Sequence, residues 1–258
     1  MKVSANLSLL FDELPMQQRP QAAAAAGFDG VEIQFPYEVP ALILREELKR
    51  CAMPLVLFNL PAGDLMSGGP GLAAVPHRQS QFDAALEEAL RYAAIARPLC
   101  INVLPGRLAE GVAQEEAMST LEANLRKTAE QFQALGVRVV CEAINPLDMP
   151  GFLINTAEQL EELLCRVDHP NCLAQLDFYH MARQGLDIAE CIVRLKDRLG
   201  HVQFADCPGR GAPGAGELTF APLLEALEAA GYRDWLGAEY RPAGDTSASL
   251  GWLAEWRL

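Results

Sequence analysis

Short apolar runs alternate with longer amphipathic segments along the whole chain. This alternation constrains the possible folds of the chain more than any other feature of the sequence. The two clearest amphipathic segments, SQFDAALEEALRYAAIA and EEAMSTLEANLRKTAEQFQAL, carry apolar residues three and four positions apart, which is typical of helices buried on one face. The apolar runs have the length of buried strands and lie at 3–9, 31–35, 55–60, 100–104, 138–144, 173–178, 201–205 and 236–240. With a last helix expected around TSASLGWLAEW, these segments form eight strand–helix units.

One joint between helix and strand recurs, in AAGFDGVEIQF, ALGVRVVCEAI and AAGYRDWLGAEY. In each, a helix end is followed by a glycine, a short polar turn and a strand, because glycine can adopt the left-handed conformation that closes a helix. Eight such units in 258 residues predict a single-domain (β/α)8 TIM barrel over residues 1–258. A doubly wound open sheet is the alternative, and the lack of a G-x-G-x-x-G motif after any strand disfavours it.

Composition narrows the class of protein further. The net charge of −13 and the lack of a basic cluster disfavour a nucleic-acid partner. No run of about 18 apolar residues is present, so we expect no membrane span, and the N-terminal stretch lacks the features of a signal peptide. The seven cysteines are odd in number and form no C-x-x-C, which predicts reduced and mostly buried thiols. We therefore expect a cytoplasmic protein with a small-molecule partner, and a homo-oligomer is compatible with the sequence.

A long loop rich in glycine and proline, residues 61–79, follows the third predicted strand. Long loops inside a compact domain often act as lids over a site. A surface insertion without a function of its own is the alternative interpretation.

The fifth to eighth predicted strands each carry an oxygen donor near the C-terminal end: Glu142, Asp177, Gln203 and Glu239. The C-terminal ends of barrel strands meet at one mouth, where active sites of such barrels lie. Three carboxylates that lie close together repel one another unless a cation holds them, and an all-oxygen set suits Mg²⁺ or Mn²⁺. One such carboxylate alone is more often a surface residue or a structural ion pair. The same position on four neighbouring strands is what favours a metal site.

The segments around these four residues, CEAIN, QLDFYHM, HVQFAD and GAEYRP, resemble the xylose isomerase-like barrel superfamily. Within it, SANLSLLF, NLPAGD, EAINPLDMPGF and GRGAPGAGEL resemble the hydroxypyruvate isomerase family, and the resemblance extends along essentially the whole chain. It implies a divalent metal held by Glu142, Asp177, Gln203 and Glu239, with Glu142 and Glu239 as the acid–base pair. The implied reaction interconverts hydroxypyruvate and tartronate semialdehyde through an enediolate.

A substrate of this kind is a 2-oxo acid, whose carboxylate needs a cationic partner. Arg210, in the glycine-rich loop after the seventh strand, could hold it bidentately, whereas the alternative is a solvated residue paired with Asp206 or Glu217. His180 is expected to contact substrate, as the histidine at this offset does in the related sugar epimerases, and a structural histidine is the alternative. Three more polar residues of the first three strands are expected to line the mouth or to support the metal ligands: Asn6, Glu32 and Asn59.

Other activities are compatible with the same barrel. A four-carbon 2-oxo-tetronate could replace hydroxypyruvate, and a ketose 3-epimerase would typically present histidine where Gln203 stands. A nuclease of the endonuclease IV type needs a histidine-rich cluster, and the chain has only four histidines. A non-catalytic sugar-acid binding protein could share the fold. The hydrogen could move by proton transfer or by a hydride shift, a choice that the sequence leaves open.

Overall fold

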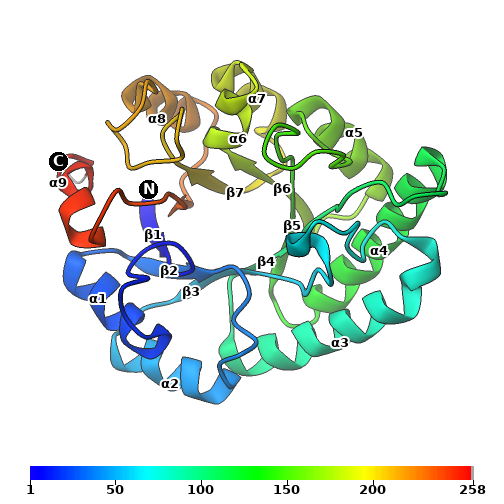
Figure 1. Ribbon diagram of the computed structural model, residues 1–258, viewed down its shortest axis with the longest axis horizontal. Coiled ribbons are helices and arrows are strands. Elements are labelled where there is room, and N and C mark those ends of the chain that lie inside the picture. The colour runs from blue at the N-terminus through cyan, green and yellow to red at the C-terminus, as the bar shows by residue number, and fades with distance from the viewer. Residues whose placement is uncertain (257–258) are drawn as a thin grey trace.

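Eight parallel strands form a closed barrel inside a ring of helices in the computed structural model, which describes residues 1–256 (Figure 1). The strands follow one another around the barrel in chain order, and β1 pairs with β8 to close it. Their bounds are β1 (Lys2–Asn6), β2 (Gly30–Ile33), β3 (Leu55–Asn59), β4 (Cys100–Val103), β5 (Arg138–Glu142), β6 (Cys172–Asp177), β7 (Leu199–Phe204) and β8 (Trp235–Ala238). The predicted (β/α)8 barrel is confirmed, and the open-sheet alternative is wrong.

The helices lie on the outside of the barrel, as the segment alternation predicts (Figure 1). The α-helices are α1 (Arg19–Ala26), α2 (Ala41–Arg50), α3 (Gln79–Ala96), α4 (Gln114–Gln133), α5 (Ala157–Val167), α6 (Phe178–Arg183), α7 (Ile188–Leu195), α8 (Phe220–Ala229) and α9 (Gly251–Glu255). The described residues also form four 3-10 helices: η1 (Met16–Gln18), which precedes α1, and η2 (Leu65–Ser67), η3 (Pro76–Arg78) and η4 (Thr246–Ser249), which lie between α-helices. The helix predicted at the C-terminus is therefore split into η4 and α9.

All eight predicted strands exist, but each ends one to three residues earlier than predicted. Apolar residues continue beyond the last strand residue and are still buried, as Leu7 and Ile144 are. Ile144 packs in a small cluster with Leu65, Leu104 and Phe152, which lie outside the strands. The shorter strands change the position of two site residues. Glu142 is the last residue of β5, and Glu239 directly follows β8 instead of lying within it.

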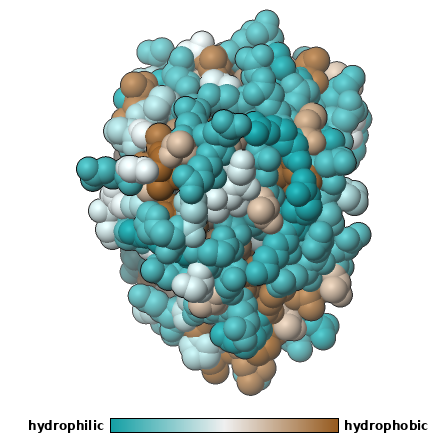
Figure 2. Space-filling view, turned by 90° about the vertical axis from the view of Figure 1, so that its right-hand side faces the viewer, coloured by the Kyte–Doolittle hydropathy of each residue, from teal (hydrophilic) through white to brown (hydrophobic). Residues whose placement is uncertain are grey.

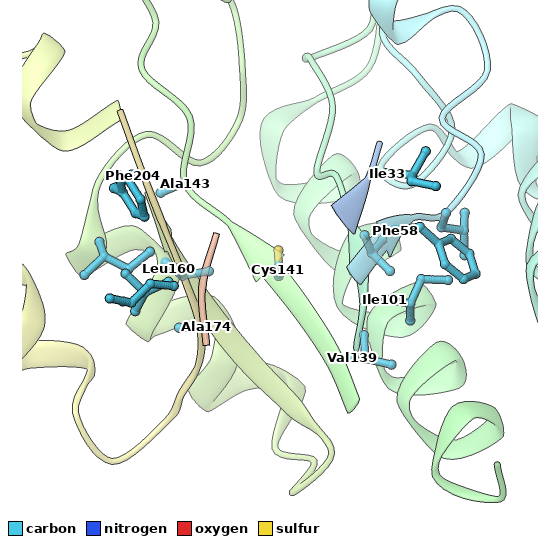
Figure 3. Close-up of a cluster of buried hydrophobic side chains, with 14 of the residues drawn as sticks. Ile33, Phe58, Ile101, Val139, Cys141, Ala143, Leu160, Ala174 and Phe204 are labelled. Atoms are coloured by element: carbon cyan, nitrogen blue, oxygen red, sulfur yellow. The ribbon is translucent and has the colours of Figure 1, made fainter. Parts of the chain in front are cut away.

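Side chains alternate between the outside and the inside of the barrel, as the two-residue period of a strand requires. Val139 and Cys141 of β5 belong to the large apolar cluster that also contains residues of the surrounding helices, part of which Figure 3 shows. Val140 belongs to a separate small cluster with Trp235 and Cys100. Glu142 has the same parity as Val140, so the strand turns this carboxylate into the barrel.

The face seen in Figure 2 is largely hydrophilic, with hydrophobic residues in several places, some of them together at its lower end. Among residues 1–256, no helix is long and apolar enough to cross a membrane. All seven cysteines are free, and four are buried as predicted, whereas Cys165 is exposed.

The predicted loop 61–79 contains η2 and η3, and its last residue begins α3. Arg107, which follows β4, holds the loop by donating hydrogen bonds from Nη1 to the carbonyl oxygens of Leu65 and Gly69, both at 2.8 Å. Met66 of this loop lines the cavity at the mouth of the barrel. The loop therefore reaches the site, and its role as a lid stays a prediction.

We expect Gly237→Ala to lower the free energy of unfolding by about 1–3 kcal/mol, because overfilled interiors force neighbours to shift. A Cβ at this position of β8 would lie 2.3 Å from Oε1 of Glu32, a buried carboxylate that is hydrogen-bonded on both oxygens. Denaturant unfolding measures the change. Gly244→Ala, at a position where an added Cβ meets nothing within 4 Å, is the matched control. Equal stability of the two variants would contradict this packing.

Candidate functional site

A cavity of about 70 Å³ lies at the C-terminal mouth of the barrel. Phe35, Met66, Leu104 and Met149 form part of its apolar wall. Each strand, or the residue that directly follows it, contributes a polar side chain: Asn6, Gln34, Asn59, Asn102, Glu142, Gln175, Gln203 and Glu239. The strand ends therefore converge on one polar chamber, as the barrel fold predicts.

Two buried carboxylate oxygens at this mouth have no hydrogen-bond partner: Oε1 of Glu142 and Oδ2 of Asp177. The other oxygen of each group is bonded, since Asn102 Nδ2 donates to Glu142 Oε2 at 3.2 Å and the backbone N–H of Tyr179 donates to Asp177 Oδ1 at 2.8 Å. Asp177 thereby caps α6 and keeps its second oxygen free. Ligand atoms of Glu142, Asp177 and His180 all lie within 4.8 Å of one another.

Burial and mutual repulsion disturb the ionisation of both carboxyl groups. Burial raises the pKa of Glu142 well above its usual range, and the negative charges of Glu239 and Asp177 raise it further. Burial also raises the pKa of Asp177 to about 7, although the Arg210 guanidinium opposes the shift. A divalent cation would favour the charged forms and would supply the missing partners of the two free oxygens. The residues present therefore fit a metal ion.

The neighbours of His180 fix which of its ring nitrogens carries the hydrogen. The backbone N–H of Asp148 donates to Asn145 Oδ1 at 2.8 Å, so the Asn145 amide nitrogen is the atom that faces His180 Nδ1, at 2.7 Å. Burial and Arg210 lower the pKa of His180 well below its usual value, which favours the neutral ring. Nδ1 is then the acceptor and Nε2 carries the hydrogen.

Nε2 of His180 lies 3.8 Å from Glu142 Oε1 and 3.6 Å from Asp177 Oδ2. A protonated ring nitrogen cannot ligate a metal, so this tautomer makes His180 a hydrogen-bond donor at the site and not a metal ligand. That is consistent with its predicted contact to substrate. The histidine lies within 4.8 Å of the ligand atoms of Glu142 and Asp177, but this short distance does not make it a metal ligand.

Glu239 is the third carboxylate of the mouth, and it is fully hydrogen-bonded. Its Oε1 accepts from Asn6 Nδ2 at 3.0 Å and from Gln34 Nε2 at 2.8 Å, and its Oε2 accepts from Arg210 Nη2 at 2.6 Å. The same Arg210 nitrogen lies 3.6 Å from Asp177 Oδ2. Arg210 therefore partly neutralises two of the predicted metal ligands.

The glycine-rich loop after β7 directs Arg210 inward, so its interpretation as a solvated residue paired with Asp206 or Glu217 is wrong. Asp206 is buried and organises the loop by accepting hydrogen bonds from the backbone N–H groups of Cys207, Gly214 and Leu218. The Arg210 guanidinium lies over the ring of Tyr179, 5.1 Å from its centroid. A loop folded around one carboxylate thus places a cation at the barrel mouth.

Gln203 lines the cavity, but both polar atoms of its side chain bind neighbours other than the three carboxylates of the mouth. Its Oε1 accepts from Gln175 Nε2 at 2.6 Å, and its Nε2 donates to Glu32 Oε2 at 2.8 Å. Glu32 lies below the mouth and does not line the cavity, which fits a supporting role. The ligand role of Gln203 stays a prediction.

Asn6 and Asn59 both line the cavity, as predicted. Asn6 donates a hydrogen bond from Nδ2 to Glu239 and accepts one on Oδ1 from the backbone N–H of Ser8. Oδ1 of Asn59, in contrast, is buried without a hydrogen-bond partner. Four polar residues of the site were not predicted: Gln34, Asn102, Asn145 and Gln175. Polar residues at the ends of otherwise apolar strands were the signal that could have found Gln34 and Asn102.

We expect the metal-free protein to become more stable as the pH falls from about 8 to about 5.5. A carboxyl group whose folded pKa lies above its unfolded value binds its proton more tightly in the folded state, so stability is lost as pH rises between the two values. For Asp177 this window runs from 3.8 to about 7. Thermal unfolding in the presence of a chelator measures it, and Asp177→Asn should flatten the profile. A melting temperature that rises over this range of increasing pH would contradict the assignment.

Residues 20–256 match the xylose isomerase-like TIM barrel family. A hydroxypyruvate isomerase of Escherichia coli is 36% identical over 257 residues, which cover 100% of both chains. A 2-oxo-tetronate isomerase of Cupriavidus necator is 37% identical, over 98% of this chain and 97% of that protein. A solved structure from Brucella melitensis, described as an AP endonuclease of family 2, superposes with a TM-score of 0.94 at 36% identity and covers 99% of this chain and 98% of that one. The chain therefore belongs to the xylose isomerase-like TIM barrel family and, within it, is similar to the hydroxypyruvate and 2-oxo-tetronate isomerases.

Proposed function

We propose that this protein is a metal-dependent isomerase that interconverts hydroxypyruvate and tartronate semialdehyde through an enediolate. The observation that carries the proposal is the pair of unpartnered, buried carboxylate oxygens of Glu142 and Asp177 at the mouth of the barrel. Glu239 lines the same cavity. The similarity to isomerases of small sugar acids supports this chemistry.

In the proposed site, Glu142, Asp177, Gln203 and Glu239 hold the divalent ion. Oxygen donors favour Mg²⁺ or Mn²⁺ over softer metals. When bound, such an ion supplies Lewis-acid stabilisation of the negative charge that develops on the substrate oxygens.

Glu142 and Glu239 form the proposed acid–base pair. Glu142, oriented by the hydrogen bond from Asn102 Nδ2 to its Oε2, can take a proton from the carbon beside the substrate carbonyl. Glu239, oriented by Asn6 and Gln34, would take up the hydroxyl proton of the substrate and return a proton to the neighbouring carbon. The proton held by Glu142 would pass to the new hydroxyl oxygen, so that both carboxylates end ionised. The Nε2–H of His180 can donate a hydrogen bond to a substrate oxygen, which keeps that oxygen oriented during the transfer.

Arg210 holds the substrate carboxylate in this proposal. Its Nη2 is bonded to Glu239 and lies near Asp177, so Arg210 would exchange these partners for the substrate carboxylate, and the divalent ion would balance the charge of the two acids. Asn59 offers a buried, unpartnered Oδ1 that can accept a hydrogen bond from a substrate hydroxyl.

A 2-oxo-tetronate is the second candidate substrate, because the 2-oxo-tetronate isomerase of Cupriavidus necator is as similar to this chain as the hydroxypyruvate isomerase of Escherichia coli. Turnover of hydroxypyruvate, a 2-oxo-tetronate and a ketohexose should be compared on one enzyme preparation. A preference for the ketohexose would contradict the proposal, and binding without turnover of any of them would indicate a sugar-acid binding protein.

We expect Glu142→Gln and Glu239→Gln each to lower the turnover number for hydroxypyruvate by about 10³-fold or more, since each removes a group that transfers a proton. Circular dichroism should show an unchanged fold, because glutamine keeps the size of the side chain. Glu217→Gln makes the same chemical change on the exposed part of the loop after β7 and should leave turnover unchanged. Turnover near the wild-type value in either site variant would remove that residue from the acid–base pair.

We expect Arg210→Gln to raise the KM for hydroxypyruvate by about ten- to a hundredfold, the range of a lost charge-assisted hydrogen bond. Steady-state kinetics at saturating Mn²⁺ measures it. Arg241→Gln, which removes an equal charge from an exposed residue near the end of β8, is the control for long-range electrostatics. Similar KM values for both variants would show that Arg210 does not hold the substrate.

A further inference from the structure

Below the mouth of the barrel lies a carboxylate that has no part in the proposed chemistry, Glu32 of β2. It is completely buried. Its Oε1 binds the hydroxyl of Ser4 at 2.6 Å and Nε2 of His201 at 2.8 Å, and its Oε2 accepts from Nε2 of Gln203 at 2.8 Å. Strands β1, β2 and β7 thus meet on one acid in the interior of the barrel.

Glu32 determines which end of the Gln203 amide faces it, because its Oε2 accepts the hydrogen bond that the amide Nε2 of Gln203 donates. The amide nitrogen of Gln203 must point to Glu32, so its carbonyl oxygen points the other way. That oxygen accepts one hydrogen bond from Gln175 Nε2 at 2.6 Å and keeps a second lone pair. Gln203 and Gln175 both line the cavity.

We infer that Glu32 is a positioning residue that fixes the amide of Gln203 so that Oε1, and not the amide nitrogen, is presented as a metal ligand. Only the oxygen of an amide can ligate Mg²⁺ or Mn²⁺, so a flipped amide would turn N–H groups toward the cation. Ser4 and His201 in turn hold Glu32 in place. The inference rests on the proposed function, because it assigns the residue that prepares one ligand of the proposed metal centre.

Glu32→Gln removes this constraint. A glutamine at position 32 offers both a donor and an acceptor, so either orientation of the Gln203 amide finds a partner. We expect Mn²⁺ to bind about tenfold more weakly to this variant, within the range seen when groups that orient metal ligands are removed. Manganese electron paramagnetic resonance at pH 8 gives the dissociation constant without any turnover.

The loss of one buried negative charge would also weaken cation binding, and a double-mutant cycle separates the two causes. Gln203→Met keeps the length of the side chain and removes the amide. If Glu32 acts by orienting that amide, Glu32→Gln should change the Mn²⁺ dissociation constant less than about twofold in the Gln203→Met background. An equal, roughly tenfold loss in both backgrounds would overturn the inference and indicate a plain charge effect.

The unmodified protein gives an independent measurement if a variant fails to fold. In ¹H–¹⁵N NMR spectra, the side-chain NH₂ of Gln203 should stay protected from exchange with water when Mg²⁺ is added, because it faces the buried Glu32. Fast exchange of these protons in the Mg²⁺-loaded protein would overturn the inference. Failure of the wild-type protein to bind Mn²⁺ would instead overturn the proposed metal centre, and the inference with it.

Discussion

Repulsion between carboxylates buried at one mouth is the constraint on which this site depends. Glu142, Asp177 and Glu239 reach the C-terminal ends of β5, β6 and β8. Burial and the neighbouring negative charges disfavour the charged forms of Glu142 and Asp177. Arg210 relieves part of this repulsion by bridging Glu239 and Asp177. Two oxygens nevertheless lack a hydrogen-bond partner, and the free energy that this costs is what binding of a cation would recover.

Below these acids, the interior of the barrel is filled by layers of side chains. Apolar residues such as Val140 and Trp235 fill one layer of the interior, and the polar network of Glu32 occupies another. The two-residue period of a parallel strand produces this arrangement, because an interior residue recurs at every second position. A strand can therefore pack its apolar part and present a polar end without breaking its pattern, as β5 does with Val140 and Glu142.

The barrel could be predicted from the sequence because strand and helix segments alternate eight times, and that rhythm does not depend on contacts between distant residues. The convergence of Glu142, Asp177, Gln203 and Glu239 on one mouth followed from the same pattern. Strand ends could not be predicted, because apolar residues beyond the strands, such as Ile144, are buried against loop residues as fully as strand residues are buried in the sheet. The partners of Arg210 could not be predicted either, because they depend on the path of the loop after β7. That path is fixed by hydrogen bonds from three backbone N–H groups to the side chain of Asp206.

The central claim, metal-dependent isomerisation through an enediolate, is tested most directly by proton NMR of hydroxypyruvate with the purified protein in D₂O. The reaction is followed with added Mn²⁺ or Mg²⁺ and, in parallel, with a chelator. The account predicts tartronate semialdehyde that carries deuterium on carbon, formed only when metal is present. Product without deuterium would contradict the exchange-coupled proton transfer assigned to Glu142 and Glu239. No conversion with either metal would contradict the assignment of hydroxypyruvate as the substrate.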